Sequence, residues 1–227
     1  MKLIQMEVGA MQNFNYVLGC GRTGQAAWID PAWEVPRVLE AARDAGLQVT
    51  RLLITHTHPD HIEGLSEARR LTGAAVHVHA LEAGVARGRL SDPAGVEAVS
   101  DDDLLEVGDL RIRAMHTPGH TPGATCYLAE GEADGPGAVF TGDTLFIGRC
   151  GRTDFAGSDP EAMHRSLRRL AALPPDTLVY PGHNYADRPV STIERESREN
   201  VHMSAPDLRE FLRRRMGEAW VAARYPS

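Results

Sequence analysis

Three histidines and an aspartate lie within one short segment of the chain, directly after an apolar run. The segment reads Thr55-His56-Thr57-His58-Pro59-Asp60-His61. Imidazole nitrogens and carboxylate oxygens are the ligands that zinc, iron and manganese take in proteins. The residues are too close together, and the proline interrupts them too early, for all four side chains to share one helix face. The four side chains can converge only if the segment wraps around a bound group. The segment therefore predicts a metal site.

Further residues of the same types follow other predicted strands. His116 and His120 follow the predicted strand at residues 110–115, Asp143 follows the one at 138–141, and His183 follows the one at 177–180. Loops at one edge of a sheet commonly carry the residues of a site. We therefore expect these side chains to join the first segment in one cluster.

The elements that must position these residues are predicted from the pattern of apolar residues. Strands are predicted at 2–8, 14–18, 25–29, 51–55, 75–79, 104–107, 110–116, 124–129, 138–141 and 177–180. Helices are predicted at 34–45, 62–71 and 159–173, from 191 onward, and at 206–216 as the last one. Residues 91–103 are predicted as a surface loop, and His77 and His79 as exposed or edge residues.

Strands and helices thus recur in the same order in the two halves of the chain. Two sheets, each with helices on one face, would pack sheet to sheet as a four-layer αβ/βα sandwich. We find no linker and expect a single domain over residues 1–227, with a short helical C-terminal extension at about 191–227. The letters G-x-G-x-x-G at residues 19–24 precede a strand rather than a helix, which predicts a hairpin turn and not a dinucleotide site.

The ordered motifs resemble the metallo-β-lactamase superfamily over nearly the whole chain. They are the segment at 55–61 followed by Pro118-Gly119-His120, Gly142-Asp143 and Gly182-His183. The resemblance implies the αβ/βα sandwich with two divalent metal ions at one edge, zinc or else iron or manganese. It implies a first ion held by His56, His58 and His120, and a second held by Asp60, His61 and His183. It also implies that Asp143 bridges the ions and that His116 is not a ligand.

The sequence resembles two branches of this superfamily. Residues 140–151 and 180–185 resemble glyoxalase II, whereas Cys150-Gly151-Arg152-Thr153-Asp154-Phe155 is similar to persulfide dioxygenases. The second resemblance implies a single Fe(II) on His56, His120 and Asp143. Pro59 stands where those dioxygenases usually carry alanine, and residues 12–16 are more similar to the hydrolases. The chain after His183 is too short for the helical domain of the longer enzymes, so we expect a short glyoxalase II-like hydrolase.

The expected reaction is the attack of a metal-activated hydroxide on a thioester, such as a glutathione conjugate. Asp60 and Asp143 are the candidate catalytic carboxylates. Arg152 and Tyr185 lie near the ligands in sequence and are candidates for binding a substrate carboxylate, with a surface ion pair and a packed ring as the alternatives. Besides the mononuclear iron dioxygenase, a metal-stabilised binding protein without catalysis remains as a further alternative.

The composition limits the other function classes. The net charge is -7, from 24 basic and 31 acidic residues, which argues against a nucleic-acid partner. No apolar run of about 18 residues occurs, which argues against a membrane partner. The three widely spaced cysteines do not form a disulfide framework, so we expect a cytoplasmic protein. The sequence leaves a homodimer open.

Overall fold

Two six-stranded sheets form the centre of the computed structural model, which describes residues 1–130 and 135–225. The first sheet has the order β1-β2-β3-β4-β5-β6. Its strands are β1 (Lys2–Val8), β2 (Asn13–Gly19), β3 (Gln25–Ile29), β4 (Gln48–Ile54), β5 (Ala75–His79) and β6 (Val96–Val99). The first three strands are antiparallel, whereas β3 to β6 run parallel to one another.

The second sheet has the order β14-β13-β10-β9-β8-β7. Its strands are β7 (Leu104–Val107), β8 (Leu110–His116), β9 (Thr125–Ala129), β10 (Ala138–Gly142), β13 (Leu178–Pro181) and β14 (Ser191–Thr192). A separate small hairpin joins β11 (Leu145–Phe146) to β12 (Arg149–Cys150).

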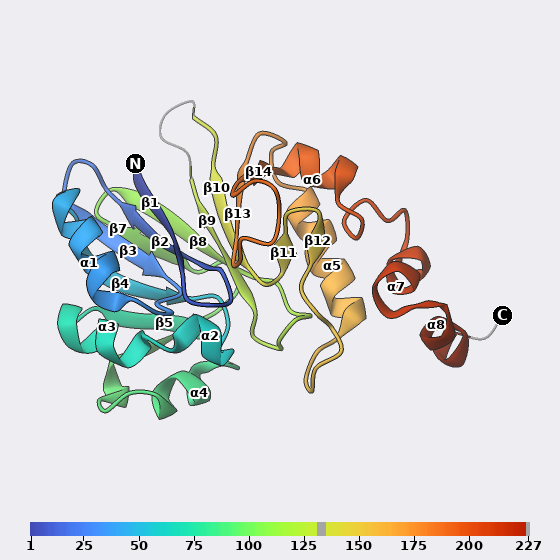
Figure 1. Cartoon of the computed structure of the whole chain (residues 1–227), viewed down its shortest axis with the longest axis horizontal. Coiled ribbons are helices and arrows are strands. Elements are labelled where there is room, and N and C mark those ends of the chain that lie inside the picture. The colour runs from blue at the N-terminus through green and yellow to red at the C-terminus, as the bar shows by residue number, and fades with distance from the viewer. Residues whose placement is uncertain (131–134, 226–227) are drawn as a thin grey trace.

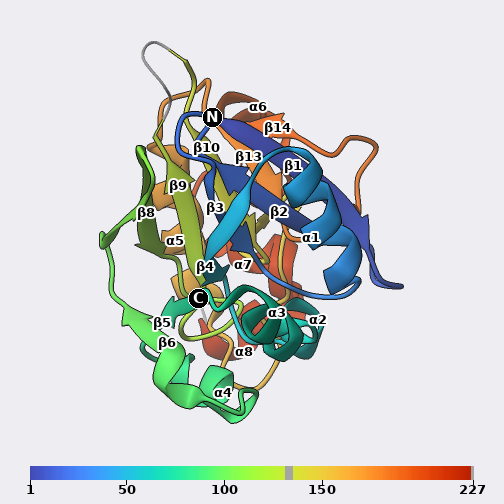
Figure 2. The same cartoon turned by 90° about the vertical axis from the view of Figure 1, so that its left-hand side faces the viewer.

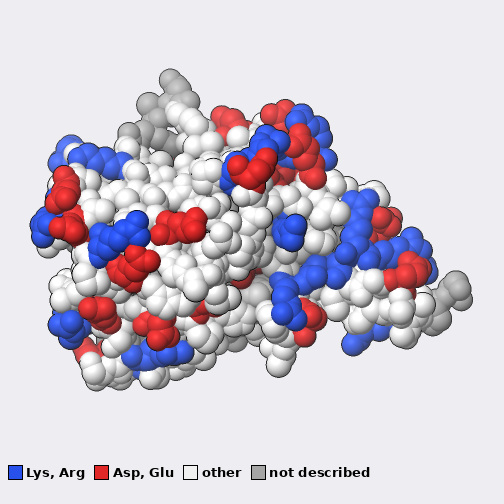
Figure 3. Space-filling view, in the orientation of Figure 1, with Lys and Arg blue, Asp and Glu red and all other residues white. Residues whose placement is uncertain are grey.

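Helices cover the outer face of each sheet, as Figures 1 and 2 show. Beside the first sheet lie α1 (Val35–Asp44), α2 (Pro59–Ile62), α3 (Leu65–Thr72) and α4 (Ala83–Gly88), and beside the second lie α5 (Pro160–Ala171), α6 (Ile193–Glu199), α7 (Leu208–Met216) and α8 (Glu218–Arg224). A short 3-10 turn, η1 (Pro93–Gly95), precedes β6. The C-terminal end of α7 is rich in arginine, which complements the helix dipole. Figure 3 shows Lys and Arg side chains gathered on the side of the molecule where α7 and α8 lie in Figure 1.

Three separate hydrophobic clusters confirm the predicted four-layer sandwich. One, with Trp28 and Leu65, fills the space between the first sheet and its helices. The second, with Tyr127 and Phe140, lies between the two sheets, and the third, with Phe211, lies between the second sheet and its helices. Each sheet therefore buries both faces, which is why strands such as β4 are apolar at successive positions.

Several elements differ from the prediction. Residues 91–103 are not a loop, because β6 lies within them and pairs in parallel with β5. The helix predicted at 62–71 corresponds to α3, the short helix α2 that precedes it was not expected, and α7 is followed by α8. His77 is 3% exposed and therefore not a surface residue. The predicted hairpin turn at 19–24 is confirmed, since β2 ends at Gly19 and β3 begins at Gln25.

Strand direction explains why distant segments meet at one edge of the sandwich. β10 and β13 are parallel, and β8 has the same direction because β9 is antiparallel to both β8 and β10. The carboxyl ends of these three strands therefore lie at the same edge. The end of β4 joins them there, where the backbone N–H of Thr125 donates to the carbonyl of Thr55. Among the described residues, no helix combines the length and the apolar character needed to cross a membrane.

Candidate metal centre

The structure brings the predicted ligands together at this edge. They form three overlapping groups whose ligand atoms lie within 4.8 Å of one another, which is close enough to hold metal ions. The groups are His56, His58 and His120; His56, His61 and Asp143; and Asp60, His61 and His183. His116 lies apart from these groups, and its ring nitrogen Nε2 donates to the carbonyl of Pro122.

Asp143 lies between the two ends of the cluster. Its Oδ1 is 3.2 Å from Nε2 of His61, and its Oδ2 is 3.5 Å from Nε2 of His120. At one end, Nε2 of His120 lies 2.9 Å from Nδ1 of His58. At the other end, Nε2 of His61 lies 3.2 Å from Nε2 of His183. One carboxylate oxygen thus faces each end, so Asp143 could offer a ligand atom to both ligand groups.

Contacts outside the cluster fix the orientation of the imidazole rings. Nδ1 of His120 donates to the carbonyl of Arg152 at 2.8 Å, and Nδ1 of His183 donates to the carbonyl of Met11 at 2.9 Å. Nδ1 of His61 lies 3.0 Å from Oδ2 of Asp30. A carbonyl oxygen can only accept, so in the neutral rings the proton is on Nδ1 and the lone pair is on Nε2, facing inward.

This donor set fits a metal ion. The Nε2 atoms of His61 and His183 face each other in a buried place, where two lone pairs repel unless a proton or a cation lies between them. Nε2 of His56 is buried and has no hydrogen-bond partner among the described residues. Buried polar atoms are rarely left unpaired, so these nitrogens indicate a group that the protein binds.

The electrostatics of the cluster depend on the balance of burial and carboxylates. Burial lowers the pKa of His56, and for His61 the nearby Asp143 and Asp30 outweigh burial and raise the pKa well above its usual value. Burial also opposes protonation of His183, yet the hydrogen bonds with Asp143 and Asp60 raise its pKa to about 9. Without metal, protons on these two rings balance the carboxylates, and a divalent cation would displace them.

Both carboxylates of the cluster stay ionised. Burial acts to raise the pKa of Asp60, but the hydrogen bond with His183 and the charge of His61 lower it. The pKa of Asp143 lies well below its usual value for the same reason, because the charge of His61 outweighs the effect of burial. Acidic ligands that remain ionised supply the negative charge that a divalent cation needs.

Glycines leave the space that Asp143 occupies. A Cβ added to Gly182 would lie 2.6 Å from Oδ1 of Asp143, and one added to Gly151 would collide with the carbonyl oxygen of Asp143. Gly142, directly before Asp143, has φ +47° and lies against the side chain of Thr55. The glycines in the Gly-Asp and Gly-His motifs therefore serve close packing around the cluster.

Two residues outside the predicted set also hold the ligands. Asp30 accepts hydrogen bonds from the backbone N–H and the hydroxyl of Thr55, both at 2.7 Å, and contacts His61. Asn13 donates from Nδ2 to the Asp60 carboxylate at 3.0 Å. Asp30 follows the apolar strand β3, which is the same signal that revealed the other ligands. That signal could have identified Asp30. Asn13 lies in the segment 12–16 that resembles the hydrolases, but the sequence gives no sign of its contact with Asp60.

Arg152 and Tyr185, the candidate substrate-binding residues, both lie beside the cluster. Tyr185 stacks on His183 with ring centroids 4.6 Å apart. The Arg152 guanidinium pairs with the Asp154 carboxylate and lies 4.1 Å from the ring centroid of Phe155. Their role in substrate binding stays a prediction.

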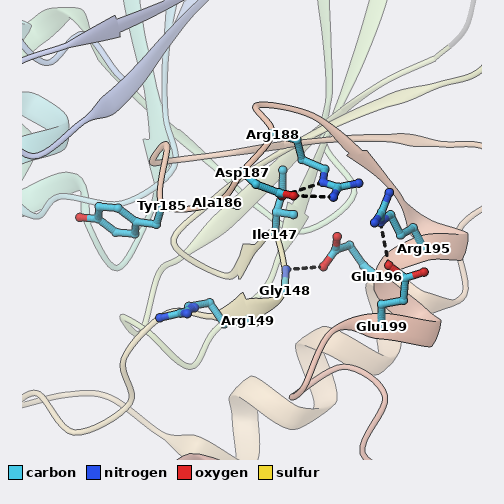
Figure 4. Close-up of a pocket in the computed structure, with 10 residues that line it drawn as sticks. All are labelled: Ile147, Gly148, Arg149, Tyr185, Ala186, Asp187, Arg188, Arg195, Glu196 and Glu199. Carbon is cyan, nitrogen blue, oxygen red and sulfur yellow. Dashed lines mark hydrogen bonds and ion pairs between the residues drawn. The ribbon is translucent and has the colours of Figure 1, made fainter.

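A cavity of about 290 Å³ opens next to Tyr185 (Figure 4). Tyr185 lies at one end, and the ion pairs Asp187–Arg188 and Arg195–Glu199 lie at the other. The lining is therefore rich in both signs of charge, which suits a polar, charged part of a small molecule.

The fold and this cluster agree with a comparison of the chain with known families. The sequence model of the metallo-beta-lactamase superfamily matches residues 8–183. The chain belongs to this superfamily.

Similar proteins of known function are found in more than one class of enzyme. The chain is 35% identical over 202 residues to a hydroxyacylglutathione hydrolase of Tolumonas auensis, covering 88% of this chain and 73% of that one. It is 32% identical over 193 residues to the mitochondrial persulfide dioxygenase ETHE1 of Homo sapiens, covering 84% and 71%. It is 28% identical over 201 residues to BaeB of Bacillus velezensis, described as a probable polyketide biosynthesis zinc-dependent hydrolase, covering 88% and 85%.

Solved structures show the same likeness. ETHE1 from Myxococcus xanthus matches with a TM-score of 0.80 and 35% identity, covering 93% of this chain and 88% of that one. TTHA1623 in a di-iron-bound form matches with a TM-score of 0.73 and 30% identity, covering 87% and 98%. The relatives thus include hydrolases and a dioxygenase, and their names include zinc and iron.

Proposed function

We propose that the protein is a two-metal hydrolase of glyoxalase II type that acts on thioesters of a small thiol. One observation carries the proposal. Asp60, His61 and His183 form a second ligand group beside that of His56, His58 and His120. A single iron on two histidines and a carboxylate would leave this second group without a role.

The cluster has the parts that such a reaction needs. Two divalent cations, when bound, supply hydroxide from water near neutral pH and polarise the substrate carbonyl. Asp143 has one oxygen toward each ligand group and would set the spacing of the two cations. The side chains of Asp60 and Asp143 are 16% and 12% exposed, so both ionised carboxylates reach the solvent side of the cluster. There they can accept a hydrogen bond from the attacking water and orient it.

The substrate that we propose is a small-molecule thioester, with a glutathione conjugate as the leading candidate. The support comes from the hydroxyacylglutathione hydrolases among the relatives and from the charged cavity beside Tyr185. Tyr185, next to this cavity, would contact the carrier. Arg152 would contact the substrate from the other ligand group, where its carbonyl accepts from His120. We also propose a cytoplasmic location, which the three free, buried cysteines support.

A persulfide dioxygenase is the second candidate. It is favoured by the match to ETHE1 from Myxococcus xanthus and by the position of the segment at 150–155 against the cluster. In that case a single iron would be held by His56, His120 and Asp143. A third candidate, a metal-binding protein without catalysis, would show neither activity.

One experiment separates these functions. The protein is purified from cells supplied with zinc, iron and manganese, and the metal content per chain is measured. Hydrolysis of S-lactoylglutathione and oxygen uptake with glutathione persulfide are then assayed side by side. We expect two metals per chain and hydrolysis of the thioester. One iron per chain with oxygen uptake and no hydrolysis would overturn the proposal in favour of the dioxygenase.

A further inference from the structure

Two exposed aromatic rings contact the metal-binding histidines, one at each end of the cluster. Phe155 is 40% exposed and Tyr185 is 45% exposed. The Phe155 ring lies edge-on to the rings of His58 and His120, with centroids 5.6 and 5.9 Å away. Tyr185 stacks instead on His183, which belongs to the other ligand group.

Neighbouring groups hold the Phe155 ring in this position. The Arg152 guanidinium lies over the ring at 4.1 Å from its centroid, and both guanidinium bonds to Asp154 neutralise its charge. The segment is also tied to the cluster, because the carbonyl of Arg152 accepts from Nδ1 of His120. The surface next to His58 and His120 thus presents an exposed aromatic ring, and the Arg152 guanidinium over that ring is already paired with Asp154.

The other end of the cluster continues into a polar space. Tyr185 lines the cavity of about 290 Å³ that also holds two ion pairs, and Figure 4 shows the tyrosine at one side of these charged residues. Arg149 lines the same cavity and carries a further positive charge. The two ends therefore differ: one presents the exposed Phe155 ring directly to the ligands, whereas the other opens into a cavity lined by charged side chains.

A thioester has two different ends, joined at the carbonyl that must lie at the metals. The charged cavity suits the thiol carrier, so the acyl group extends the other way, toward Phe155. We infer that the site selects substrates with an apolar acyl group, which packs against the Phe155 ring, over a small hydroxyacyl group. The inference rests on the proposed thioester hydrolysis. Burial of apolar surface supplies the preference, worth up to about fourfold in affinity for each fully buried methylene.

Thioether analogues test the binding without any turnover. The zinc-loaded protein is titrated by calorimetry with S-hexylglutathione and S-methylglutathione. We expect the hexyl compound to bind at least about tenfold more tightly, by the methylene contribution above. In Phe155→Ala, the ratio of hexyl to methyl affinity should fall at least about fivefold. Phe155→Leu should retain most of the ratio because leucine keeps the apolar contact.

A matched control excludes a general effect of removing surface apolar groups. Leu71 is 47% exposed, lies on α3 and is not adjacent in sequence to any residue of the ligand groups, so Leu71→Ala should leave the ratio unchanged. The zinc content of each variant is measured alongside. Equal affinity for the two thioethers, or a hexyl-to-methyl ratio that Phe155→Ala and Phe155→Leu leave unchanged, would overturn the inference.

Turnover separates this inference from the proposed function. We expect kcat/KM to be higher for S-hexanoylglutathione than for S-lactoylglutathione, with the difference reduced in Phe155→Ala. If the hexyl preference depends on Phe155 but neither thioester is hydrolysed, the apolar subsite stands and the proposed function fails. If the lactoyl thioester is hydrolysed faster and Phe155 has no effect on the ratio, the function stands and the inference fails.

Discussion

The Glu82 carboxylate accepts a hydrogen bond from the hydroxyl of Thr57, which stands between the ligands His56 and His58. Its other oxygen accepts from the backbone N–H of Gly123 at 3.2 Å, in the loop that follows His120. The Glu82 side chain is buried, with only 6% of its surface exposed. One buried carboxylate thus holds both segments that carry the first ligand group.

Replacing Glu82 should weaken metal binding. In Glu82→Ala, Thr57 and Gly123 lose their shared acceptor, so we expect the dissociation constant for zinc to rise about 10- to 100-fold, as for other residues that support metal ligands. Competition with a chromophoric chelator measures it. Glu67→Ala removes an exposed carboxylate on α3 and serves as the control. Unchanged affinity in Glu82→Ala would show that the contact does not position the ligands.

Metal stoichiometry should distinguish the two ligand groups. His183→Ala removes a member of the group with Asp60 and His61 and leaves the group of His56, His58 and His120 intact. We expect the variant to retain one metal per chain and to lose thioester hydrolysis. His116→Ala is the control, because His116 belongs to none of the groups. Two metals per chain in His183→Ala would contradict the proposed ligand set.

The space left by Gly151 should be essential for Asp143. A Cβ in Gly151→Ala would displace the backbone of Asp143, so we expect loss of metal and destabilisation by about 1 to 3 kcal/mol. At Gly84, on α4, a Cβ meets no atom within 4 Å. Gly84→Ala should therefore retain the metal and stabilise the protein by about 0.5 to 1 kcal/mol. Urea unfolding and metal analysis check both variants, and a Gly151→Ala protein with full metal content would refute the argument.

Stability should depend on pH through His202. Burial and the nearby Arg215 lower its pKa from 6.5 to about 4, and its Nδ1 accepts from the backbone N–H of Cys150. As the pH falls from about 6.5 to 4, the unfolded chain binds a proton that the folded protein refuses, so stability decreases. In His202→Asn, the free energy of unfolding should fall by about 2 to 3 kcal/mol less over this pH range.

The pH prediction is checked by denaturant unfolding of both proteins at pH 7 and pH 4, with a chelator present to remove metal effects. The carboxylates titrate in both proteins, so the difference between the two isolates His202. If both proteins lose the same free energy of unfolding, His202 is not held neutral in the fold.

The sequence predicted the ligand cluster because each ligand type followed an apolar strand. The same rule applied to Asp30 would have identified the residue that holds His61. Glu82 could not have been found, because its contact with Thr57 joins segments that only the fold brings together. Local patterns identify residues at strand ends, but they carry no information on which helix packs beside a loop.

The secondary-structure predictions that were wrong have similar causes. Residues 91–103 were expected to form a loop because the segment is polar and acidic, yet residues 96–99 within it form β6, of which Glu97 and Ala98 are exposed. This strand forms the edge of its sheet and needs few apolar residues, since its neighbour β5 supplies the pairing. His77 was expected at the surface because it alternates with His79, yet sheet and helix layers cover β5 on both faces. Periodicity within one strand does not show how many layers cover it.

The ligand cluster joins the two halves of the chain, because His56 and His61 follow a strand of the first sheet while His120, Asp143 and His183 follow strands of the second. A cation bound there acts as a cross-link that closes a long loop of the polypeptide, with an entropic gain of the kind given by other long-range clips. Chelation would cut this link, and the protease resistance of the whole sandwich would fall with it.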